Sequence, residues 1–148
     1  VMFTANLSKD MAQKLPFAIE GETWLISIRD RNKEAIVPDK IFKNVLFVDF
    51  NDINGNILKH NPEEQSNGIT DKEAEAIADF ILEAKQKEVN LFVNCNMGMC
   101  RSGGVVKLLR CLHWQLMEDV KLPDMFPNNE VRYAIQKLVV QKLKPNAN

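Results

Sequence analysis

Reactive chemistry in this chain is concentrated at residues 95–101, where a cysteine and an arginine enclose five residues that include a glycine. The segment reads Cys-Asn-Met-Gly-Met-Cys-Arg, and Ser-Gly-Gly follows it. An apolar run precedes Cys95, and an amphipathic helical pattern follows Arg101. This order is typical of a loop that binds a phosphate group, with a nucleophile at its floor.

Each residue type in this segment suits an oxyanion ligand. The N–H groups of a tight loop and of the following helix start carry positive partial charge. Arg101 adds a planar, permanently charged fork that can bind two oxygens at once. Gly98 lets the backbone turn where a side chain would block it. The same positive field favours the thiolate form of Cys95, and Ser102 can donate a hydrogen bond to its sulfur.

Length, composition and charge set the broad class of the protein. The chain has 148 residues, 45% hydrophobic and 26% charged, which predicts one soluble globular domain over residues 1–148. A net charge of −1 gives no electrostatic basis for a nucleic-acid or membrane partner. Three cysteines, an odd number, argue against a disulfide framework and favour a reducing, cytoplasmic location.

Strand and helix patterns alternate along the chain. Strands are predicted at residues 2–5, 23–28, 45–50 and 91–94, and helices at residues 9–15, from 70 onward, 102–117 and 129–142. Residues 51–69 read as a loop, and the apolar run at 45–50 predicts a central strand. The alternation predicts an α/β domain with a mostly parallel sheet of about four or five strands flanked by helices. Ligands bind beyond the carboxyl ends of such strands, which is where residues 95–101 lie.

Residues 94–102 resemble the signature of the cysteine-dependent protein phosphatases, in particular the compact dual-specificity type. That signature is His-Cys, five residues with a central Gly, and then Arg-Ser or Arg-Thr. The resemblance covers most of residues 23–140 and implies the three-layer fold of that family. It also implies hydrolysis of phosphotyrosine, phosphoserine or phosphothreonine in protein substrates, without a metal or cofactor. The phosphate-binding residues that it implies are Asn96, Met97, Gly98, Met99, Cys100 and Arg101.

The resemblance further implies a role for an aspartate that follows the strand upstream of the loop. In the family this residue is the general acid, and Asp52 of the Phe-Asn-Asp segment matches it. Asp49 and Asp124 are the alternatives. Cys95 then attacks phosphorus, Asp52 protonates the leaving oxygen, and water hydrolyses the cysteinyl phosphate.

Two residues of the segment leave alternatives open. Asn94 occupies the position of the family's histidine, which favours as an alternative a weak or inactive pseudophosphatase that binds phosphorylated ligands. Cys100 is a possible redox partner of Cys95, because low-molecular-weight tyrosine phosphatases also place a cysteine before the loop arginine. A rhodanese-like sulfurtransferase is a third hypothesis, against which the Arg-Ser-Gly ending speaks.

Overall fold

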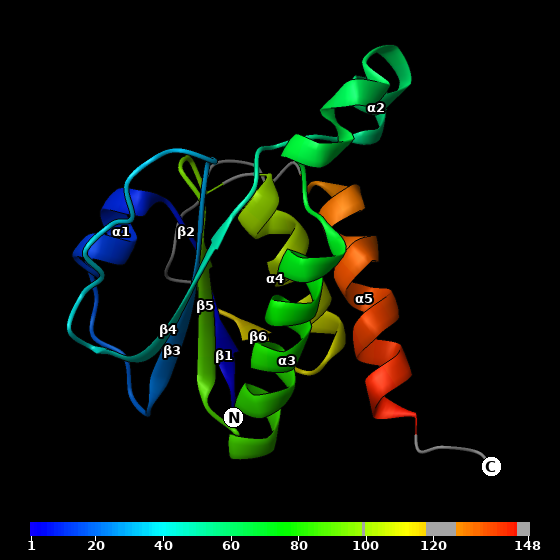
Figure 1. Ribbon diagram of the computed structural model, residues 1–148. Coiled ribbons are helices and arrows are strands. Elements are labelled where there is room, and N and C mark those ends of the chain that lie inside the picture. Colours follow the sequence, from blue (N-terminus) through cyan, green and yellow to red (C-terminus); the bar gives the residue numbers. More distant parts are fainter. Residues whose placement is uncertain (99, 118–126, 145–148) are drawn as a thin grey trace.

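The computed structural model describes residues 1–98, 100–117 and 127–144. Short strands and helices alternate along the chain (Figure 1). In chain order the elements are β1 (Phe3–Thr4), β2 (Asn6–Leu7), α1 (Lys9–Gln13), β3 (Thr23–Arg29), β4 (Phe42–Asp49), α2 (Gly55–His60), the 3-10 helix η1 (Pro62–Asn67), α3 (Asp71–Lys87), β5 (Asn90–Asn94), α4 (Arg101–Cys111), β6 (Gln115–Leu116) and α5 (Asn129–Leu143).

The main sheet has four strands in the order β2-β5-β3-β4, and every neighbouring pair is parallel. β1 and β6 form a separate parallel pair. Helices α3, α4 and α5 lie on one side of the sheet and α1 on the other (Figure 1). These features confirm the predicted α/β fold with a mostly parallel sheet between helical layers. Of the helices in the described residues, none is long and apolar enough to cross a membrane.

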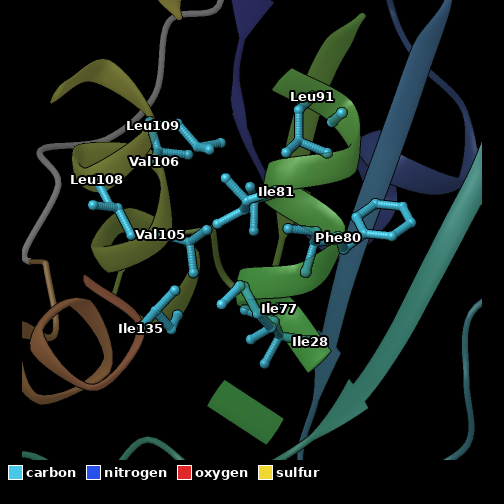
Figure 2. Packing of buried hydrophobic residues seen from close by; sticks show 14 of the residues in the cluster. Ile28, Ile77, Phe80, Ile81, Leu91, Val105, Val106, Leu108, Leu109 and Ile135 are labelled. Atoms are coloured by element: carbon cyan, nitrogen blue, oxygen red, sulfur yellow. The ribbon is translucent and has the colours of Figure 1, made fainter. Parts of the chain in front are cut away.

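The larger core lies between the sheet and the three long helices. Figure 2 shows the apolar side chains that meet there, among them Ile77 and Ile81 of α3, Val105 and Leu109 of α4, and Ile135 of α5. All five are fully buried. Their helical spacing is what the sequence pattern indicated, because one apolar stripe per helix is enough to cover the sheet.

The predicted central position of the strand at residues 45–50 is wrong, because β4 lies at an edge of the sheet. Both faces of β4 nevertheless contact apolar residues. Leu46 packs against the helical core, whereas Val45 packs against the smaller core beside α1. The apolar run therefore reflects apolar contacts on both faces of β4, although the strand is only partly buried. The open edge shows in Phe47, whose exposed fraction is 43%.

Residues 51–69 are not a plain loop, since they contain α2 and η1. Asn54 caps α2 by accepting a hydrogen bond from the N–H of Ile57 at 2.9 Å. Neither short helix contains a buried residue. Because no face of either helix is buried, their sequences show no amphipathic pattern. Helix α2 projects from the body of the molecule (Figure 1).

The helix after the loop is shorter than predicted, because α4 ends at Cys111 and β6 follows. His113 takes a left-handed conformation, with φ of 79°. Trp114 is then buried and donates from Nε1 to the carbonyl of Val89 at 3.0 Å. Pairing of β6 with β1 supplies the backbone hydrogen bonds that a longer helix would have made.

Candidate active site

The loop between β5 and α4 places a buried thiol beside a buried hydroxyl. Cys95, only 3% exposed, follows directly after the last residue of β5, and Ser102 lies in the first turn of α4. The Cys95 Sγ and Ser102 Oγ atoms are 3.0 Å apart, within hydrogen-bond distance. A hydroxyl that donates here stabilises negative charge on the sulfur.

The loop carbonyls are held on the outside by β2 and the start of α1. Asn6 Nδ2 donates to the carbonyl of Gly98 at 2.8 Å, and the N–H of Lys9 donates to the carbonyl of Asn96 at 3.2 Å. A trans peptide directs its N–H opposite to its C=O. The N–H of Met97 therefore points away from the start of α1 and is not used by this contact.

The backbone at Gly98 requires glycine for two reasons. Its φ is +72°, a conformation that other residues rarely adopt. A Cβ atom there would also lie 2.7 Å from the carbonyl carbon of Leu7 and from the backbone nitrogen of Ser8. The loop packs directly onto the chain that joins β2 to α1.

Arg101 is oriented by two acceptors at the carboxyl edge of the sheet. Its Nη1 donates to Asp30 Oδ1 at 2.6 Å and to the carbonyl of Phe50 at 2.7 Å. The arginine side chain is 7% exposed. Among the described residues only Nη1 of this guanidinium makes a hydrogen bond, so Nε and Nη2 can serve two oxygens of one ligand.

Sequence reasoning missed Asp30, because it lies in a mixed polar segment without a motif. The available signal was its place directly after β3. A carboxylate there faces the same edge of the sheet as the loop that follows β5.

Asp52 lies beside the loop. Its Oδ1 accepts a hydrogen bond from Asn128 Nδ2 at 2.8 Å. Asp52, Asn128 and Cys100 together line a hollow of about 320 Å³. Asp52 follows the carboxyl end of β4, and this position places the predicted acid beside the loop.

The two alternative acids differ from Asp52 in their placement. Asp49 forms a two-contact ion pair with Arg29, in which Nη2 lies 3.1 Å from Oδ2. Asp124 lies outside the described residues, as does Met99 of the loop. Of the two candidate acids in the described part of the chain, Asp52 is the one that shares a hollow with Cys100.

Asn128 is a second residue that sequence reasoning missed, and it links three parts of the site. Its backbone N–H donates to the carbonyl of Cys100 at 2.9 Å. Its Oδ1 accepts the N–H groups of Glu130 and Val131 and so caps α5. An asparagine directly before a helical pattern is a common cap signal, whereas its bond to Asp52 depends on tertiary packing.

Gly104 makes the approach of Asn128 possible. A Cβ atom at Gly104 would lie 2.5 Å from the Asn128 carbonyl oxygen. The second glycine after Ser102 therefore permits close contact between α4 and the start of α5, which offsets its low helix propensity.

Asn94 stands at the position of the expected histidine and is 1% exposed. Its Nδ2 makes a long contact of 3.4 Å with the carbonyl of Cys95. Its Oδ1 is buried and finds no partner among the described residues. An acceptor in this state requires a donor from a ligand or a water molecule.

Cys100 lies next to Asp52 at the end of the loop. Burial raises the pKa of the Cys100 thiol above its ordinary value of 9.0, and the charge of Asp52 and a hydrogen bond with it raise this pKa further. The thiol of Cys100 is therefore protonated near neutral pH. Cys111 is also free but is exposed at the end of α4.

The chain was compared with protein-family models, with curated proteins and with solved structures. None of these comparisons found a match. The described residues contain no group of three or more His, Cys, Asp or Glu side chains that could hold a metal ion. What is assembled around residues 95–101 is a thiol, a hydroxyl, a fixed guanidinium and a nearby carboxylate.

Proposed function

We propose that this protein hydrolyses phosphomonoesters on phosphotyrosine, phosphoserine or phosphothreonine side chains through a cysteinyl-phosphate intermediate. One observation carries most weight. The sulfur of Cys95 lies 3.0 Å from Ser102 Oγ at the floor of a loop that ends in Arg101. A nucleophile and the donors for an oxyanion thus belong to a single turn of chain.

In the first step the Cys95 thiolate attacks phosphorus in line with the bond to the leaving oxygen. The S–P bond forms as the P–O bond breaks, and Asp52 gives its proton to the leaving oxygen. Nε and Nη2 of Arg101, with the loop N–H groups, hold the remaining phosphate oxygens. These donors are in place before the reaction, so little reorganisation is needed as charge develops.

In the second step water attacks phosphorus and the S–P bond breaks. The Asp52 carboxylate takes the proton from water, and inorganic phosphate forms. Cys95 departs as a thiolate, which the hydroxyl of Ser102 stabilises. Asp52 therefore acts first as an acid and then as a base, and each turnover restores its protonated form.

A reduced thiol is essential to this cycle, because only the thiolate is nucleophilic. We therefore infer a reducing, cytoplasmic setting for the protein. The partners in this proposal are a phosphorylated protein and, in the loop, phosphate or a similar oxyanion. A monophosphate ester is the better substrate, because the residues inside the loop carry no charge beyond Arg101.

A second candidate function is that of a pseudophosphatase, which binds phosphorylated ligands without turnover. The buried asparagine at position 94, where the phosphatase signature has a histidine, favours it. A charged histidine at this position would support the thiolate of Cys95, whereas an amide brings no charge.

Hydrolysis of 4-nitrophenyl phosphate distinguishes the two functions. We expect turnover by the wild-type protein and none by Cys95→Ser, whereas Cys111→Ser, which alters an exposed thiol, serves as the matched control. Vanadate binding without turnover in the wild type would support the pseudophosphatase. Absence of both turnover and vanadate binding would contradict both candidates.

A further inference from the structure

A hollow of about 520 Å³ lies beside the phosphate loop, on the α1 side of the sheet. Its size falls within the usual range of ligand pockets, and a phosphate group alone would leave most of it empty. It is lined by Lys9, Ser27, Ile28, Arg29, Asp30, Lys33, Glu34, Ile36, Asn94 and Asn96.

The hollow adjoins the phosphate site through two residues. Asp30 lines it and also holds Nη1 of Arg101 at 2.6 Å. Asn96 belongs to the loop itself and lines the hollow as well. One ligand could therefore place a phosphate in the loop and a neighbouring group in this hollow.

The floor of the hollow is polar. Side chains alternate between the two faces of a strand, so Asn94 shares a face with Phe92, and Ser27 shares a face with Leu25. Phe92 and Leu25 belong to the smaller core next to α1, which places both polar side chains on the side of the hollow. Asn94 is 1% exposed, and its Oδ1 atom, which has no partner among the described residues, supplies an acceptor for an N–H or O–H donor.

The free charge of the hollow is positive, because two of its charged lining residues are paired with side chains outside it. Arg29 is paired with Asp49, and Asp30 with Arg101. Neither Lys9 nor Lys33 forms an ion pair within the part of the chain that the structure describes.

One acidic side chain, Glu34, shares the hollow with these two lysines. The free charge that remains is two cations against one anion. A ligand with a carboxylate would complement it, whereas a neutral polyol would leave both lysines unpaired.

We propose that this hollow is a subsite for an acidic residue next to the phosphorylated residue of a protein substrate. Lys9 and Lys33 attract its carboxylate. Asn94 Oδ1 accepts a hydrogen bond from the peptide backbone, directly or through one water molecule. The subsite rests on the proposed function, since it selects among phosphorylated peptides that the loop binds.

Matched phosphotyrosine peptides test this subsite. They carry glutamate, alanine or lysine at the positions on either side of phosphotyrosine, and kcat/KM is measured for each. Because exposed ion pairs contribute little individually, we expect the glutamate peptide to exceed the alanine peptide by roughly three- to tenfold, and the lysine peptide to be poorest. The preference should weaken at high salt.

Substitutions then test whether the two lysines of the hollow cause the preference for glutamate. Lys9→Ala combined with Lys33→Ala should reduce the glutamate-to-alanine ratio to about one, and Lys33→Glu should raise kcat/KM for the lysine peptide relative to the glutamate peptide. Lys43→Ala, which removes an exposed charge on β4 outside the hollow, is the matched control and should keep the ratio.

A binding measurement separates failure of the subsite from failure of the proposed function. Fluorescence anisotropy of labelled peptides on Cys95→Ser reports affinity without any turnover. If 4-nitrophenyl phosphate is not hydrolysed, hydrolysis is contradicted, and a glutamate preference in binding still supports the subsite. Equal affinities and equal kcat/KM values for the three peptides would overturn the subsite alone. Faster turnover of a sugar monophosphate than of the glutamate peptide would overturn the proposed protein substrate, and the subsite with it.

Discussion

Asn128 Nδ2 lies 2.8 Å from Asp52 Oδ1, although the two residues are separated by 76 positions in the sequence. The same nitrogen donates to the carbonyl of Ile53 at 3.0 Å. Asn128 is 4% exposed, whereas Asp52 is half-buried and lines a hollow with it. The start of α5 thereby sets the position of the carboxylate that the proposed mechanism uses twice.

Replacement of Asn128 by aspartate tests this positioning role. Asn128→Asp keeps an acceptor for the cap of α5 but replaces the donor to Asp52 with a second carboxylate. We expect kcat to fall about tenfold or more with phenyl phosphate, whose leaving group needs a proton, and less with 4-nitrophenyl phosphate. Gln141→Glu adds the same charge at an exposed position of α5 outside that hollow and is the control. An equal fall with both substrates would contradict the role.

The identity of the general acid can be read from pH–rate profiles. Asp52→Asn should lower kcat roughly 100- to 10,000-fold with a poor leaving group and flatten the basic limb of the profile. Asp49→Asn breaks the ion pair with Arg29 and should leave the basic limb in place. Loss of that limb in Asp49→Asn, with retention in Asp52→Asn, would transfer the role to Asp49.

The ion pair between Asp30 and Arg101 predicts an effect on oxyanion binding. Asp30→Ala removes one of the two acceptors that orient Nη1. Small displacements of a binding group are costly, so we expect the inhibition constant of vanadate to rise roughly 10- to 100-fold. Asp10→Ala, an exposed residue of α1, is the control. Unchanged vanadate inhibition in Asp30→Ala would show that the carbonyl of Phe50 orients Arg101 sufficiently.

Glu73 predicts a pH-dependent contribution to stability. Burial raises the pKa of Glu73, but hydrogen bonds from Thr70 and Arg31 outweigh burial and hold this pKa below its ordinary value of 4.5. A depressed pKa means that the folded state favours the carboxylate. The contribution is therefore present above about pH 4.5 and disappears as the pH falls through the folded-state pKa.

Urea unfolding of Glu73→Gln measures that contribution. We expect the free energy of unfolding to drop by about 1 kcal/mol near neutral pH, because a charged hydrogen-bond network is lost, and the gap to the wild type to close in acid. Glu83→Gln, in an exposed pair with Lys87 on the same helix, is the control. A gap that persists unchanged in acid would assign the loss to packing.

Cys100 predicts a reversible response to peroxide. Peroxide oxidises the Cys95 thiolate to a sulfenic acid, and condensation with the Cys100 thiol gives a disulfide and water. Wild-type activity lost to brief peroxide treatment should then return with dithiothreitol, whereas Cys100→Ser should lose activity permanently. Cys111→Ser is the control, and full recovery of Cys100→Ser would exclude the disulfide.

The sequence by itself determined the longer strands and helices and the loop that follows β5. Three features could be recognised because each depends on neighbours within a few residues. They are the buried strand, the Cys-to-Arg segment with its glycine, and the amphipathic helix. Caps are local in the same way: a serine directly before a helix is a common cap signal, and Ser8 accepts from the N–H of Met11 at 3.3 Å. Apolar periodicity identified the buried faces of α3 and α5 because a helix repeats every 3.6 residues.

Only the tertiary structure decided which polar groups meet. Asp30 pairs with Arg101 across 71 positions, and Asn128 with Asp52 across 76. Neither contact leaves a local pattern, since it arises where the carboxyl ends of parallel strands converge. Packing likewise placed β4 at the edge and ended α4 before the buried Trp114. The apolar periodicity of a helix or strand indicates that one of its faces is buried. Which residues cover that face depends on how the whole chain packs.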